Sequence, residues 1–226
     1  MITKKIKGRV KLDAEKLYDL TSAIDTLKGF VSKKFDETFD IAIKLGVDVT
    51  KADQNIRGMV SLPHGTGKKI KVAVFTKDKQ SEAKKAGADF VGDTDLIDKV
   101  AGGFLGFDIA IATPDIMPQL SKIAKILGPK GMMPNPKLGT VASDPAKAIE
   151  LAKAGQIEYR AEKSGIIHAG FGKASFKTPA LVENANALID ALKKAKPATS
   201  KGNYILTAAV STTQGPGLKL DVKALQ

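Results

Sequence analysis

The sequence of 226 residues contains no cysteine and only two histidines, His64 and His168. The lack of cysteine excludes disulfide bonds, thiolate zinc sites and cysteine nucleophiles. Two histidines cannot form a metal site alone, and neither stands in a helical ligand motif. No apolar run approaches the roughly eighteen residues of a membrane span, and the basic N-terminal stretch lacks the apolar core of a signal peptide. We therefore expect a cytoplasmic protein without metal, other cofactor or membrane partner.

The groupings that catalysis requires are also missing. Nothing resembles a serine triad or a nucleophile elbow, and Asp95 and Asp98 fit the solvated face of a helix. The stretch Gly65-Thr66-Gly67-Lys68 looks like a fragment of a phosphate-binding loop. However, the complete motif requires a glycine where Leu62 stands and a serine or threonine where Lys69 stands. We predict that the protein is not an enzyme; the alternative is an α/β enzyme that binds a nucleotide.

Positive charge is what the chain has in excess. Lysine and arginine total 36 against 24 aspartates and glutamates, a net charge of +12. Such an excess is typical of proteins that bind a polyanion, most often nucleic acid. A basic solubility surface and a membrane-surface protein are the alternatives.

The two ends of the chain have mixed helix and strand patterns. Helical spacing of apolar residues, including Leu12 and Leu17, predicts a helix over 12–30. Phe39, Ile41, Ile43 and Leu45 alternate with polar residues and predict a strand with one buried face. Other predicted elements are a strand over 56–62, paired strands over 157–160 and 166–169 joined by a turn, a helix over 178–194 capped by Thr178, and strands over 204–213 and 218–222.

Between these ends, short apolar strands alternate with helices. The predicted strands are 70–75, 90–91 and 109–112, and the predicted helices are 81–86, 96–100, 116–127 and 145–154. Such alternation implies parallel strands joined by crossover helices. We therefore predict an α/β and α+β protein of two domains. Residues 1–66 and 157–226 form a discontinuous α+β domain, and residues 67–156 form an inserted, Rossmann-like α/β domain of three layers.

Glycines stand at both crossings between the predicted domains. Gly65 and Gly67 lie at the first crossing and Gly155 at the second. Paired crossings of this kind suggest a hinge.

Three short segments of the outer domain carry groups suited to RNA. They are Lys33-Lys34-Phe35-Asp36-Glu37-Thr38, Gly172-Lys173-Ala174-Ser175-Phe176 and Ser211-Thr212-Thr213-Gln214-Gly215. Lysines meet phosphates, an aromatic ring packs on a ribose or base, and hydroxyls and amides bind the 2′-hydroxyl groups that distinguish RNA from DNA. A buried ring, a surface turn and a hairpin end are the ordinary explanations. All three segments fall in the same predicted domain, which favours RNA.

Residues 126–141 form the most distinctive stretch, Ile-Leu-Gly-Pro-Lys-Gly-Met-Met-Pro-Asn-Pro-Lys-Leu-Gly-Thr-Val. Its glycines and prolines exclude a helix interior or a central strand, and its apolar residues favour an ordered loop between two helices. This stretch resembles the signature of the bacterial ribosomal protein L-one family. The resemblance covers nearly the whole chain and includes Phe35-Asp36-Glu37-Thr38, Asp53-Gln54-Asn55-Ile56-Arg57-Gly58, Ser61-Leu62-Pro63-His64-Gly65, Ala112-Thr113-Pro114-Asp115, Gly172-Lys173-Ala174-Ser175-Phe176 and Thr213-Gln214-Gly215-Pro216.

The resemblance implies a structural protein of the large ribosomal subunit. Its implied partners are the ribosome with a stalk of large-subunit rRNA, the exit-site tRNA whose release it assists, and its own mRNA, whose translation it represses. The free protein is expected to be a monomer.

The family's RNA contacts fall on Phe35, Thr38, Lys173, Ser175, Thr213 and Gly215, with Lys34 and Lys44 as weaker assignments. From the three segments we add Gly172, Thr212 and Gln214 as candidates. Many family members have methionine at the position of Gln214, where an amide would replace an apolar contact with hydrogen bonds. A DNA-binding repressor is the second alternative, although no helix has the basic, groove-reading character that such a role usually needs.

Overall fold

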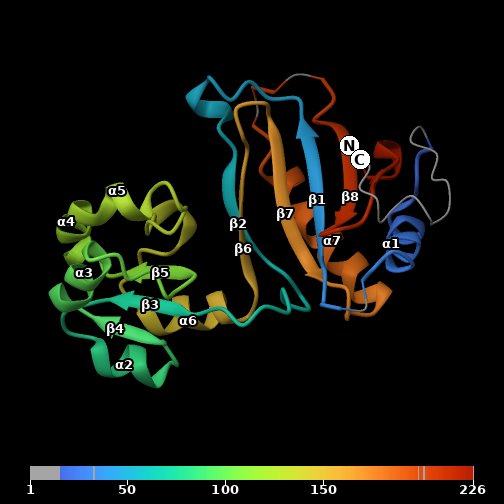
Figure 1. Ribbon diagram of the computed structural model, residues 1–226. Helices are drawn as coiled ribbons and strands as arrows, with labels where there is room; N and C mark the ends of the chain where they lie inside the picture. The colour runs from blue at the N-terminus through green and yellow to red at the C-terminus, as the bar shows by residue number, and fades with distance from the viewer. Residues whose placement is uncertain (1–15, 33, 198, 201, 226) are drawn as a thin grey trace. The chain divides into compact units, whose positions relative to one another are not determined.

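The structure, a computed structural model, describes residues 16–32, 34–197, 199–200 and 202–225 (Figure 1). Lys33 and residues 12–15 of the predicted first helix lie outside the described residues. Contacts divide the chain into a first unit within residues 1–67 and 157–226 and a second unit, residues 68–156. Gly67 thus falls in the first unit. That these units correspond to two domains with the predicted bounds stays a prediction.

The first unit is built on a four-stranded antiparallel sheet in the order β7-β1-β8-β9 (Figure 1). Its strands are β1 (Thr38–Leu45), β7 (Ile166–Lys173), β8 (Ile205–Thr212) and β9 (Gly217–Lys219). Phe39, Ile41, Ile43 and Leu45 are all buried, which confirms the predicted alternation of β1. They pack against the buried faces of helices α1 (Leu20–Lys28) and α7 (Thr178–Lys194).

The smaller elements of this unit are a two-stranded sheet and two short 3-10 turns. Strand β2 (Arg57–Ser61) pairs with β6 (Gln156–Arg160). The turns are η1 (Ala52–Gln54) and η5 (Val222–Ala224). The pairing of β6 with β2 corrects the prediction that 157–160 and 166–169 form a hairpin. β7 pairs with β1 instead, and only a single bridge, Ala161 to Ile167, joins the two predicted partners.

The first helix is shorter than its apolar spacing predicts. It begins at Leu20, because the Asp19 carboxylate accepts a hydrogen bond from the backbone N–H of Thr21 and caps the helix there. Tyr18 lies in an extended segment and bridges Leu220, and Leu17 is exposed. For the described residues 16–19, the helical spacing was therefore wrong.

Helix α7 has the predicted bounds but not the predicted cap. Lys177 occupies the cap position, and Thr178 is the first helical residue, followed by Pro179 in the first turn. The Thr178 hydroxyl donates to the Asp25 carboxylate of α1 at 2.7 Å. Because that hydroxyl is used between helices, it does not cap its own helix.

The second unit is a three-layer α/β structure. Parallel strands β3 (Val72–Phe75), β4 (Phe90–Gly92) and β5 (Ile109–Ala112) run in the order β4-β3-β5. Ala73 and Phe75 of β3 pack against α3 (Thr94–Ala101) and the turns that follow β5. Val72 and Val74 face the opposite side, against α2 (Gln80–Lys85) and α6 (Pro145–Lys153). Helices on both faces of a parallel sheet confirm the predicted class.

The predicted helix 116–127 is a series of short turns. These are η2 (Pro114–Ile116), α4 (Met117–Leu120), η3 (Ser121–Ile123) and α5 (Ala124–Leu127), and η4 (Pro136–Leu138) follows in the loop. Pro118 lacks an N–H donor, and the Ser121 hydroxyl donates to the Pro118 carbonyl at 2.6 Å. Both effects interrupt the regular i to i−4 ladder. Among the described residues, no helix is both long and apolar enough to span a membrane.

Candidate nucleic-acid interface

Antiparallel pairing brings the three predicted RNA segments to one end of the large sheet. β1 begins where β7 and β8 end, so that Thr38 is opposite Lys173 and Phe39 is opposite Thr212. We call the resulting surface the sheet-end face and define it by Phe35, Thr38, Lys173, Ser175, Thr213 and Gly215. Residues far apart in the chain are therefore neighbours because of strand direction alone.

Lys173 is the cation at the centre of this face. Its ammonium group donates to the Thr38 hydroxyl at 2.9 Å and lies 3.4 Å from the backbone carbonyl oxygen of Asp36. An ammonium group has three N–H donors, so one remains for an RNA phosphate. Burial raises the pKa of the neighbouring Asp40 carboxyl, and the positive charges of Lys173 and His168 oppose that rise.

Two hydroxyl-bearing residues of the face are held by Asp36 and by Thr38, just before and at the start of β1. The Ser175 hydroxyl and backbone N–H both donate to the Asp36 carboxylate, at 2.8 and 3.0 Å. The Thr213 N–H donates to the Thr38 carbonyl at 3.1 Å, and the Thr38 N–H donates back to the Thr213 hydroxyl at 3.0 Å. Each hydroxyl oxygen keeps acceptor capacity for a 2′-hydroxyl group.

Glu37 was not among the predicted site residues. Its side chain is only 1% exposed, and its carboxylate accepts from the backbone N–H of Ser32 at 2.7 Å and of Gln214 at 3.2 Å. It therefore fixes the turn after β8 to the start of β1. The available signal was a carboxylate within a segment otherwise suited to RNA, next to the alternating pattern of β1.

The remaining candidates differ in exposure. Phe35 is 42% exposed, and Lys34 and Gln214 are also exposed. Thr212 is buried, and its hydroxyl has no hydrogen-bond partner among the described residues. Gly172 is buried too, and a Cβ there would lie 2.5 Å from Leu181 Cδ2. RNA contact by any of these residues stays a prediction.

Lys44 is not brought to the sheet-end face. It lies near the other end of β1, opposite Ile166 and Thr207. Six residues separate it from Thr38, a distance of about 20 Å along a strand. The structure therefore separates Lys44 from the candidates with which the resemblance grouped it.

The first crossing is anchored beside this face. Gly65 and Gly67 both have positive φ, 66° and 70°, a conformation that favours glycine. A Cβ on Gly67 would lie 2.8 Å from Lys173 Cγ and 3.0 Å from the Phe176 ring. Gly155, at the second crossing, has φ of 95°.

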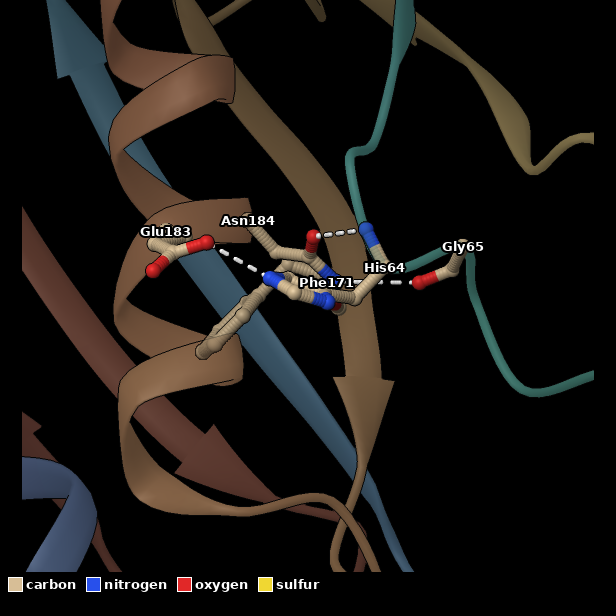
Figure 2. A network of polar contacts seen from close by, with 5 residues as sticks. All are labelled: His64, Gly65, Phe171, Glu183 and Asn184. Atoms are coloured by element: carbon tan, nitrogen blue, oxygen red, sulfur yellow. Dashed lines mark hydrogen bonds and ion pairs between the residues drawn. The ribbon is translucent and has the colours of Figure 1, made fainter.

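Asn184 of α7 holds this crossing in place (Figure 2). The register of β7 shifts beside Phe39 and leaves Phe171 as an extra residue. Asn184 donates to the Phe171 carbonyl at 2.8 Å and to the Gly65 carbonyl at 2.9 Å, and it accepts from the His64 N–H at 3.0 Å. Sequence reasoning missed this residue, although an asparagine on the apolar face of a predicted helix was a usable signal.

The same segment lacks the context of a phosphate-binding loop. Such a loop follows a strand and opens a helix. Here the described residues after Gly67 lead into strand β3 at Val72, and the Gly65 carbonyl is held by Asn184. In the part of the chain that the structure describes, no cluster of three His, Asp or Glu side chains could hold a metal ion.

Comparison with protein families decides the relationship. The model of the ribosomal protein L1p/L10e family matches residues 27–216. The chain belongs to this family. The match includes every residue of the sheet-end face and the whole second unit. As a member of the L1p/L10e family, the chain is a structural ribosomal protein that binds rRNA, and its place is the ribosome in the cytoplasm.

Proposed function

We propose that this L1p/L10e family member grips a stalk of large-subunit rRNA with its sheet-end face. The proposal rests on one observation, the convergence of Lys173 with hydroxyl-bearing residues from three separate segments at the end of the sheet. Hydroxyl and backbone groups would read the shape and 2′-hydroxyls of the RNA, and lysines would supply affinity that depends on salt. Four further candidates adjoin this contact: Lys34, Gly172, Thr212 and Gln214. Lys44 would contact RNA at a separate place, near the other end of β1.

We further propose the finer roles that the resemblance implies. The protein assists the release of deacylated tRNA from the exit site and represses translation of its own mRNA through a site similar to its rRNA target. Gly65, Gly67 and Gly155 act as hinge positions. The protein is of the bacterial type and is a monomer when free. Support comes from family membership and from the positive φ of the three glycines.

Two substitutions separate the electrostatic and hydrogen-bonding parts of the rRNA contact. Lys173→Gln is expected to lower the slope of log affinity against log salt by about 0.7–0.9, the value of one phosphate contact. Thr213→Val removes the hydroxyl that accepts from the Thr38 N–H. The loss of one hydrogen bond, worth about 1 kcal/mol, should lower rRNA affinity roughly fivefold without changing the salt slope. Filter binding of stalk rRNA across a salt series measures both.

Matched controls lie elsewhere in the first unit. Lys194→Gln, at the exposed end of α7, and Thr207→Val, exposed in the middle of β8, should bind rRNA like the parent. If Lys173→Gln and Thr213→Val also bind like the parent, the sheet-end face is not the rRNA contact.

The alternative function is that of an α/β enzyme that binds a nucleotide, and it has little support. The degenerate glycine segment precedes a strand rather than a helix, as described above. Stabilisation of the protein by a specific nucleotide would favour the enzyme.

A further inference from the structure

The net positive charge of the second unit comes from one segment. Residues 68–156 contain 14 lysines and 10 acidic residues, with no arginine. Between Asp115 and Asp144, residues 116–143 contain four of these lysines and no aspartate or glutamate. The rest of the unit is balanced, so this segment, which we call the acid-free segment, carries its entire positive excess.

The first half of the acid-free segment is fixed to the core by one apolar side. Ile116, Leu120, Ile123 and Leu127 are buried at helical spacing against the β3 and β5 face of the core. This spacing turns the intervening positions outward. Lys122 and Lys125, three residues apart on consecutive turns, are both exposed.

The second half is an ordered loop. Pro134 and Leu138 are buried, and Met132 and Met133 pack against the core. The Asn135 N–H donates to the Thr140 hydroxyl at 2.8 Å, and the Ala112 N–H of β5 donates to the Thr140 carbonyl at 2.9 Å. The loop is therefore tied to the edge of the sheet and is shaped before any partner arrives.

The outer side of this loop combines a cation with open backbone. Lys130 is exposed, as are its neighbours Pro129 and Gly131. Gly131 and Gly139 both have positive φ, and a Cβ built on either would meet nothing within 4 Å. Backbone without side chains and beside lysines permits close approach of a phosphate-bearing strand.

We propose that the acid-free segment is a second RNA-binding surface, which takes the phosphodiester backbone of a folded RNA other than the stalk rRNA. Its lysines have no carboxylate within their own segment, and its fixed shape reduces the ordering cost of binding. The segment contains no aromatic residue, so base stacking does not contribute and recognition follows backbone shape rather than sequence. We take tRNA as this RNA because of the exit-site role proposed above, so the proposal rests on the proposed function.

The test uses the full chain, first bound to stalk rRNA through the sheet-end face, with folded tRNA as the second ligand. The triple variant Lys122→Gln, Lys125→Gln and Lys130→Gln removes three phosphate contacts. Each contact contributes a slope of about 0.9, so between 50 and 200 mM salt the parent should lose roughly 40-fold more tRNA affinity than the variant. Binding of stalk rRNA by the variant should equal that of the parent.

A matched triple variant controls for net charge. Lys77→Gln, Lys84→Gln and Lys85→Gln change three exposed lysines of the same unit that stand near Asp78 and Glu82. This control should keep the tRNA affinity and the salt slope of the parent. Equal loss in the two triple variants, or no loss in the first, would overturn the assignment of the surface.

Three further outcomes separate the possible errors. Polyglutamate that displaces tRNA as effectively as unlabelled tRNA would show a general polyanion surface and overturn the RNA assignment. If the parent binds stalk rRNA but not tRNA, the second surface is refuted while the rRNA contact stands. If the parent binds neither RNA, the proposed function itself fails.

Discussion

Asn184→Ala is expected to lower the free energy of unfolding by about 3 kcal/mol. The side chain is fully buried and makes the three hydrogen bonds to His64, Gly65 and Phe171 shown in Figure 2. Alanine leaves these backbone groups without their partner. The Phe171 carbonyl is buried, and a buried, unsatisfied group costs about 1–3 kcal/mol, whereas the partly buried groups of His64 and Gly65 add less. The loss should exceed any effect of the nearby ion pair between His64 and Glu183, because both of its side chains are exposed and such pairs contribute about 0–1 kcal/mol.

Urea denaturation followed by circular dichroism measures this change. Asn186→Ala is the matched control, since Asn186 is exposed two residues further along the same helix. Its effect should stay within about 0.5 kcal/mol, the usual range for surface substitutions. Equal stability of the two variants would show that Asn184 does not anchor the first crossing.

Glu37→Gln is expected to reduce both stability and rRNA affinity. The buried carboxylate accepts hydrogen bonds from the Ser32 and Gln214 N–H groups, and bonds to a charged group contribute about 1.5–3 kcal/mol. The neutral amide weakens both bonds and can turn its NH₂ group toward an N–H donor. We expect a loss of about 2 kcal/mol in unfolding free energy. Release of the turn at Thr213 and Gly215 should lower rRNA affinity about tenfold.

The control for this variant is Glu162→Gln. Glu162 is exposed in the turn before β7, at the opposite end of that strand from Lys173. Thermal unfolding and filter binding should leave it indistinguishable from the parent. An unchanged rRNA affinity in Glu37→Gln, together with the expected loss of stability, would show that the turn after β8 does not contribute to the rRNA contact.

Local patterns predicted much of the fold. Alternation fixed the buried face of β1, and helical spacing gave the bounds of α7 at Thr178 and Lys194. Alternating strands and helices in the middle of the chain gave the parallel sheet and its two layers of helices. These features depend on residues close in sequence, which is where periodicity carries information.

Pairing between strands that are distant in sequence was harder to predict from local patterns. β6 could have joined β7 in a hairpin, but it pairs with β2, a strand about a hundred residues earlier. The extra residue Phe171 and the use of Asn184 to satisfy its carbonyl depend on another long-range pairing, the register of β7 against β1. The prediction of the first helix failed at residues 16–19 for a local reason, because the cap at Asp19 starts α1 at Leu20 despite the apolar residue Leu17.

For the candidate interface, the sequence supplied the residue types and the structure supplied their grouping. Lys173, Ser175 and Thr213 were chosen by chemistry, and strand direction explains why they are neighbours. Lys44 had the same chemistry but lies at the other end of β1. The roles of Asp36 and Glu37 in holding Ser175 and the Gln214 turn could not be predicted, because these partners are remote in sequence.

Selective binding of structured RNA through the sheet-end face can be measured directly. Filter binding of the full chain would compare folded stalk rRNA with duplex DNA of equal length across a salt series. The account predicts tight binding of the rRNA and much weaker binding of the DNA, with a preference that persists at high salt because hydroxyl contacts are not screened. Equal affinity for the two nucleic acids, falling together as salt rises, would contradict it and reduce the net charge of +12 to a general basic surface.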